Sequence, residues 1–300
     1  MLFGIYLGVA TALMQSLSYL ASASFIKKHG SGFKLLIFSH LAMGALSAVL
    51  LPFFLPVKFF TGGTFSAILM AVWIVTFVLG QGGFFFSQKY IESSRLASLL
   101  GLKIIVLAIA SLIIYGGKIN QLQIAGILLS TVAAFIMNWS SGKPLTGKGI
   151  LALTVSLISF SATDLTETEL VLFADQGNIV SAGIGVTLLC YLVLGICSVP
   201  FLFKHPWKLQ MQKDALPFAL LWLFSQMTLL ICFGLLRPVF GNIIQSSRGL
   251  FSVLLGIIAC RLHWDVMEFC NDRKLWIRRA IAALMMTGGI ICFSFGKIIG

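Results

Sequence analysis

One lysine lies deep inside an apolar stretch of this chain. Lys103 stands about eight residues into the apolar run 95–115, where an ammonium group costs about 2.5–3.5 kcal/mol in a membrane helix. That cost is tolerated where the ammonium faces a wet cavity or pairs with an anion. Because Glu92 and Asp164 are expected near helix ends, we predict that Lys103 faces a pathway and attracts an anionic group of a solute. The alternative is a lysine near a helix boundary that extends to the membrane surface.

Two apolar runs each carry a stripe of polar side chains. The stripes are Thr11, Gln15 and Ser18 in the first run, and Ser156, Ser159 and Thr163 in the sixth. Their spacing places each set on one helix face, and polar side chains in membrane helices usually face the bundle interior. We predict that Gln15, Ser18, Ser159 and Thr163 bind substrate. The alternative for the hydroxyl groups is helix–helix hydrogen bonding.

Two further runs place a tryptophan beside a polar residue on one helical face. The pairs are Trp73 with Thr76 and Trp222 with Gln226. An aromatic ring next to a hydrogen-bonding group suits the wall of a small-molecule site. We therefore add these four residues to the predicted substrate site, with core packing or a place in the interfacial aromatic belt as the alternative.

His40, in the second run, is the candidate for proton coupling, since an imidazole titrates near physiological pH. The sequence Ile91-Glu92-Ser93-Ser94-Arg95 recurs as Ile244-Gln245-Ser246-Ser247-Arg248. Arg95 and Arg248 occupy matched positions in the two copies, and we predict that they gate the two mouths of a pathway. The alternative for His40 is a histidine that is hydrogen-bonded in the packed core. The alternative for Arg95 and Arg248 is that they bind lipid phosphate groups at the starts of their helices.

The composition identifies the environment of these residues. Of the 300 residues, 59% are hydrophobic and 10% are charged, and the mean hydropathy is +1.02. A soluble protein averages about 25% charged residues, so soluble enzymes and nucleic-acid-binding domains are excluded. The net charge of +12 comes from basic residues that stand singly or in pairs between apolar runs, as membrane topology requires. We predict no nucleic-acid partner.

Apolar runs long enough to cross a bilayer recur ten times. They are residues 2–25, 33–56, 66–87, 95–115, 120–139, 148–166, 179–203, 215–237, 243–262 and 278–298. Strands are excluded because the runs are long and do not alternate. Most lysines and arginines fall in the connections after the odd-numbered runs, so the positive-inside rule makes that side cytoplasmic and places both termini outside.

The repeated pentapeptide divides the ten runs into two halves, residues 1–142 and 143–300. Five spans is an odd number, so the halves insert with opposite orientations, as in many secondary transporters. We therefore predict an all-α integral membrane protein of ten transmembrane helices in two inverted five-helix repeats. Chance similarity between Leu- and Ser-rich helices is the alternative.

A family resemblance follows from the first copy. The stretch Lys89-Tyr90 through Ser94-Arg95-Leu96-Ala97-Ser98-Leu99-Leu100, on to Gly117 and Gly126, resembles the EamA-type repeat of the drug/metabolite transporter superfamily. The second copy, from Ser247-Arg248 to Gly288-Gly289, fits more loosely. The chain departs from the family at Ile104-Ile105, where Glu-Pro is frequent, and at Lys118, where a Glu is frequent. The resemblance implies a ten-helix transporter with its cavity between the halves, and it names no substrate.

The expected function is a secondary transporter or facilitator that moves a small metabolite by alternating access. An anionic or zwitterionic solute, such as an amino acid, fits the role given to Lys103. No ATP-binding or hydrolase motif is found, and His263, Asp265 and Glu268 form one compact polar group in a connection. A membrane-embedded enzyme and a non-transporting scaffold remain the alternatives. We expect no cofactor or metal, a small solute and the lipid bilayer as partners, self-association left open, and a multi-pass position in the cell (inner) membrane.

Overall fold

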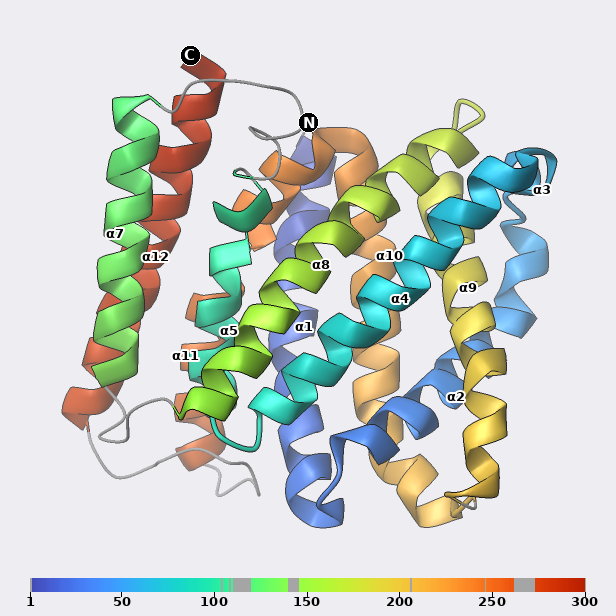
Figure 1. The fold of residues 1–300 in the computed structure, drawn as a ribbon, viewed down its shortest axis with the longest axis horizontal. Helices are drawn as coiled ribbons and strands as arrows, with labels where there is room; N and C mark the ends of the chain where they lie inside the picture. Colours follow the sequence, from blue (N-terminus) through green and yellow to red (C-terminus); the bar gives the residue numbers. More distant parts are fainter. Residues whose placement is uncertain are drawn as a thin grey trace.

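The computed structural model describes residues 2–103, 105–107, 109, 120–139, 146–205, 207–245, 247–261 and 273–299. Within these ranges every regular element is helical (Figure 1). The all-helical prediction is therefore confirmed for the described part of the chain. The connection with His263, Asp265 and Glu268 lies outside it, as do Gly117 and Lys118 of the family resemblance.

The described helices overlap the predicted apolar runs, but several begin or end elsewhere. From residues 1–142 the structure has α1 (Leu2–His29), α2 (Gly32–Leu50), η1 (Leu51–Phe53), α3 (Val57–Thr61), α4 (Gly63–Ser87), α5 (Ser93–Leu99), η2 (Leu100–Leu102) and α7 (Gln121–Trp139). From residues 143–300 it has α8 (Gly147–Ala174), α9 (Ile179–Ser198), η3 (Val199–Phe203), α10 (Leu209–Gln245), α11 (Arg248–Arg261) and α12 (Arg273–Ile299).

Six of the described helical segments are long and apolar enough to cross a membrane. They are Leu2–His29, Gly32–Phe53, Gly63–Ser87, Gly147–Ala174, Ile179–Phe203 and Leu209–Pro238. Helix α4 shows why water is the wrong solvent for this surface, because Ile68, Val75 and Leu79 are each more than half exposed. Such a surface suits lipid, so the helices fit a multi-pass membrane protein.

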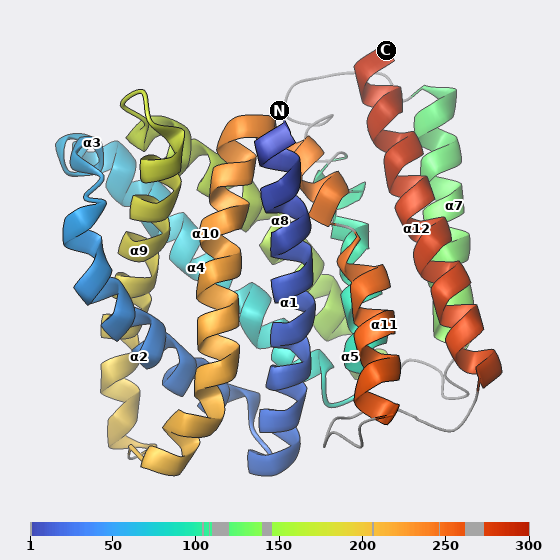
Figure 2. The same cartoon turned by 180° about the vertical axis from the view of Figure 1, so that it is seen from behind.

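The main helix packings join the two halves of the chain. Helix α1 packs along α10, α4 along α8, α2 along α9, α5 along α11, and α7 along α12. The α7–α12 pair lies at one end of the bundle, and α2 and α9 lie at the other (Figures 1 and 2). The same views place the start of α1 and the end of α12 at one edge. The halves thus interlock along the bundle.

Helix α8 is longer than the predicted run 148–166. It continues to Ala174, so Asp164 and Glu167 lie within the helix. The expectation that Asp164 sits near a helix end is wrong, and the predicted end of the run at residue 166 is eight residues too early. The reason is that both carboxylates are buried inside the bundle, where protein groups replace water as their partners.

Helix α10 is broken at Arg237, which has φ 67° and ψ 159°. Pro238 explains the position of the break, because proline lacks an N–H donor and disfavours a helical conformation in the preceding residue. After the break the chain turns at the edge where α1 begins (Figure 2). This turn carries Asn242 and Gln245 into the interior, where both are buried.

Helices α2 and α9 touch through two glycines. A Cβ atom on Gly44 would lie 2.7 Å from the Cα of Gly195, which is closer than a carbon–carbon contact allows. The absence of side chains therefore lets the two backbones meet. Small residues have this role in many membrane helix pairs.

We predict that Gly44→Ala destabilises the protein, because the new methyl group forces α2 and α9 apart. Overpacking of this kind costs about 1–3 kcal/mol, and thermal unfolding of the purified protein in detergent measures it. Gly82→Ala is the control, since a Cβ there meets nothing within 4 Å. Equal melting temperatures for the two variants would contradict the close approach.

Candidate binding cavity

A small polar cavity lies among the helices of both halves. Its walls are formed by Gln15, Tyr19, Phe77, Lys103, Phe160, Thr163, Asp164, Glu167, Trp222, Gln226, Leu229, Gln245 and Arg248. The cavity volume is about 20 Å³, which is room for about one water molecule. A metabolite therefore needs the helices to move apart before it can bind in this space.

Lys103 and Asp164 form a buried ion pair in the cavity wall. The Lys103 Nζ lies 2.8 Å from Asp164 Oδ2, and the same oxygen accepts a hydrogen bond of 2.9 Å from Asn242 Nδ2. The Lys103 carbonyl accepts a bond of 3.1 Å from Ser161 Oγ. Lys103 thus lines the cavity, but its ammonium charge is matched by a carboxylate of the chain.

Arg248 lines the same cavity from the first turn of α11. Its Nη1 donates to Gln15 Oε1 at 3.3 Å and to Tyr19 OH at 3.4 Å, which are long for hydrogen bonds. Gln245 Nε2 donates to the same Gln15 oxygen at 2.9 Å. The buried Nε of Arg248 has no hydrogen-bond partner, and no carboxylate among the described residues forms an ion pair with this guanidinium.

Glu167 is the second carboxylate of the cavity. Its Oε1 accepts a hydrogen bond of 2.8 Å from Trp73 Nε1. Trp73 therefore contacts a residue that lines the cavity but is not among the described lining residues itself. Within the described residues no cation lies at ion-pair distance from this carboxylate. Cys190 and Tyr191, on the adjacent helix α9, interact electrostatically with Glu167.

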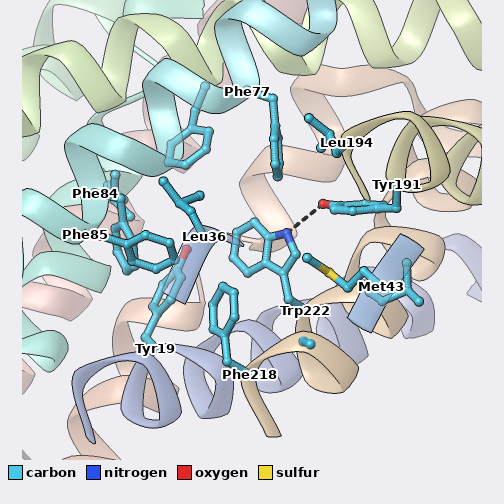
Figure 3. Packing of buried hydrophobic residues seen from close by; sticks show 14 of the residues in the cluster. Tyr19, Leu36, Met43, Phe77, Phe84, Phe85, Tyr191, Leu194, Phe218 and Trp222 are labelled. Atoms are coloured by element: carbon cyan, nitrogen blue, oxygen red, sulfur yellow. Dashed lines mark hydrogen bonds between the residues drawn. The ribbon is translucent and has the colours of Figure 1, made fainter. Parts of the chain in front are cut away.

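An aromatic cluster forms one wall of the cavity. Trp222 Nε1 donates to Tyr191 OH at 2.7 Å, and the Trp222 ring stacks on Phe218 (Figure 3). Phe77 and Tyr19 also lie against Trp222. Because these side chains continue into the packed core, the cavity is closed on this side by aromatic packing.

Half of the residues predicted to bind, gate or carry protons line this cavity. They are Gln15, Lys103, Thr163, Trp222, Gln226 and Arg248. The residues Ser18, Trp73, Thr76, Ser159, Arg95 and His40 are not among the described residues that line it. The functional roles given to all twelve stay predictions.

Local contacts explain several of these positions. Ser18 Oγ donates to the carbonyl of Gln15 in its own helix at 2.7 Å, a local backbone bond that serine often makes in membrane helices. Thr76 Oγ1 accepts from Thr163 Oγ1 at 3.1 Å, so it contacts a lining residue. The His40 ring lies beside the Phe77 and Tyr191 rings, which contact each other, and His40 is not among the described residues that line the cavity.

Four polar lining residues escaped the sequence reasoning: Tyr19, Asp164, Glu167 and Gln245. A signal for the two acids was present, since residues three apart share a helix face. It was missed because the sixth run was ended at residue 166. Gln245 belongs to the repeated pentapeptide, where only the arginine was singled out.

The comparisons with known proteins establish the fold and no function. No family model matches the chain, and no curated protein matches it. A solved structure described as "Crystal structure of protein" superposes with a TM-score of 0.61 at 15% sequence identity, over 96% of this chain and 95% of the other. At that identity the likeness concerns the fold alone.

The described residues hold no group of three His, Cys, Asp or Glu side chains that could bind a metal ion. The cavity instead offers hydrogen-bonding groups, two carboxylates and two cations beside aromatic rings. Such a wall is chemically suited to reversible binding of a small polar solute.

We predict that Lys103→Met destabilises the protein by about 3–5 kcal/mol, because it leaves Asp164 buried without its counter-ion. Thermal unfolding in detergent measures the loss. The double variant Lys103→Met/Asp164→Asn restores at least half of it, since the asparagine still accepts from Asn242. Lys148→Met, at an exposed position of α8, is the control. A double variant no more stable than the single one would contradict the pairing.

Proposed function

We propose that this chain is a secondary transporter or facilitator that moves a small polar metabolite across a membrane by alternating access. The observation that carries the proposal is the polar cavity buried among apolar helices of both halves. Charged groups inside a membrane protein are expensive to bury and commonly mark solute pathways.

The proposed architecture is ten transmembrane helices in two inverted five-helix repeats. In the two halves α1 corresponds to α8, α2 to α9, α4 to α10, α5 to α11 and α7 to α12. If every helix is exchanged with its counterpart, the α1–α10 packing becomes the α8–α4 packing. The same exchange leaves the α2–α9, α5–α11 and α7–α12 packings unchanged. This exchange symmetry supports an internal repeat, and the shared edge of α1 and α12 supports an even number of crossings.

The proposed cycle opens the cavity alternately to the two sides of the membrane. In the present conformation the aromatic cluster around Trp222 closes one side, and the space inside admits about one water molecule. Rocking of one half against the other would widen the cavity, as in other transporters built from inverted repeats. The resemblance of residues 89–126 to the EamA-type repeat supports the same cycle.

We expect purified protein in liposomes to move at least one solute of a labelled panel of amino acids, monocarboxylates, sugars and nucleosides faster than protein-free liposomes do. Leu229→Trp should reduce that flux at least tenfold, because the larger indole obstructs the widened cavity without removing a polar group. Rapid-filtration uptake measures the rate.

Leu220→Trp is the matched control, since Leu220 lies on the same helix and is 38% exposed. It should keep the original flux, and both variants should elute as monodisperse protein. Equal flux in Leu229→Trp and Leu220→Trp would remove the cavity from the pathway. Absence of flux for the whole panel would count against transport.

A further inference from the structure

The charges around the cavity are not all paired by the chain itself. Lys103 and Asp164 neutralise each other at 2.8 Å. Elsewhere in the described interior, Arg279 pairs with Glu92. Arg248 and Glu167 differ from these residues, because each is buried, lines the cavity and has no ion-pair partner of opposite charge among the described residues.

Arg248 presents a donor pole. Its side chain is 3% exposed, its Nε has no hydrogen-bond partner, and its Nη1 makes two long bonds to neutral groups. A guanidinium binds a carboxylate through two parallel N–H···O bonds, and Nε together with an Nη is one edge that does so. The neutral oxygens of Gln15 and Tyr19 do not supply the negative charge that this edge favours.

Glu167 presents an acceptor pole. Its side chain is 2% exposed, and Trp73 Nε1 occupies only Oε1. The groups that face it are Asp164 on its own helix, Lys103 after η2, and Cys190 and Tyr191 on α9. The Lys103 ammonium is taken by Asp164, so an ammonium group on a solute would be the counter-ion that Glu167 lacks.

We propose that the transported solute is a small zwitterion, with its carboxylate on Arg248 and its ammonium group on Glu167. This inference rests on the proposed function and names the substrate class of the same cavity. A simple carboxylate leaves Glu167 without a counter-ion, and a simple amine leaves Arg248 without one. A zwitterion supplies both, and its remaining atoms lie against the rings of Phe77 and Trp222, which line the cavity.

Trios of related compounds test the charge requirement. One trio is 2-aminobutyrate, butyrate and propylamine; another is phenylalanine, 3-phenylpropionate and phenethylamine. A third exchanges 2-aminobutyrate for 4-aminobutyrate, which separates the two charges. Thermal unfolding of the purified protein is measured at equal compound concentration and ionic strength, because a ligand that binds only folded protein raises the melting temperature.

In at least one trio the zwitterion raises the melting temperature, and both single-charge relatives raise it by less than half as much. The inference is overturned if a single-charge relative stabilises as well as the zwitterion does. It is also overturned if no zwitterion stabilises the protein. Sodium chloride and sodium phosphate serve as controls, and equal stabilisation by either would assign the effect to a general anion site.

Substitutions at two positions assign the poles. Glu167→Gln should reduce the affinity for the zwitterion at least tenfold and leave that for the matching carboxylate within twofold. Arg248→Gln should reduce both at least tenfold, and Arg248→Lys should restore part of the loss. The controls are Glu169→Gln on α8 and Arg261→Gln on α11, both exposed residues of the same helices.

Each variant is first checked for a cooperative melt, so that a folding defect is recognised, and the trios on the unmodified protein test the inference independently. Unchanged affinities in Glu167→Gln and Arg248→Gln would remove both poles. Zwitterion binding without flux into liposomes would leave the substrate class standing and reject transport. Flux of a singly charged or neutral solute that is insensitive to Glu167→Gln and Arg248→Gln would leave transport standing and reject the zwitterion.

Discussion

The constraint that organises this molecule is that a charge inside an apolar bundle must find its partner within the protein. Lys103 follows a short 3₁₀ turn, Leu100–Leu102, and its ammonium reaches Asp164 in the middle of α8. Water does not take the place of either partner at this buried position, so the ion pair holds a segment of the first half against a helix of the second half. Breaking such a pair costs more than forming it contributes, which makes it a strong determinant of where the two segments lie.

The same constraint determines which faces of the helices point inward. In α8 the acids Asp164 and Glu167 are buried, whereas Ile158 is more than half exposed. In water this arrangement would be inverted, and in lipid it is the stable one because the exposed surface needs no hydrogen bonds. The polar stripe therefore selects the interior face of α8, and the lipid-facing remainder needs only to be apolar. Helix α4 follows the same rule, with Trp73 buried against Glu167 and Val75 exposed.

The sequence was a good guide to the helices and a partial guide to the cavity. Long apolar runs predict helices because the backbone in lipid must satisfy its own hydrogen bonds, and the described part of every predicted run contains a helix. Gln15 was found because an amide in an apolar run has few local partners. The pairing of Lys103 with Asp164 was not predictable, since it depends on how α8 crosses a segment about sixty residues away. Glu167 lies just beyond the predicted run 148–166, because hydropathy alone treats an inward-facing acid as the end of a helix.

Several polar links of the cavity join the two halves of the chain, among them Lys103 to Asp164, Trp73 to Glu167, and Gln15 to Gln245 and Arg248. Any movement that widens the cavity by separating the halves must stretch these links. A solute that bonds to the same groups replaces what is lost, so it stabilises the opened arrangement more than the closed one. A ligand shifts a conformational equilibrium only through such a difference in affinity. In the proposed cycle, the groups that hold the halves together are thus the same groups that make their separation depend on the solute.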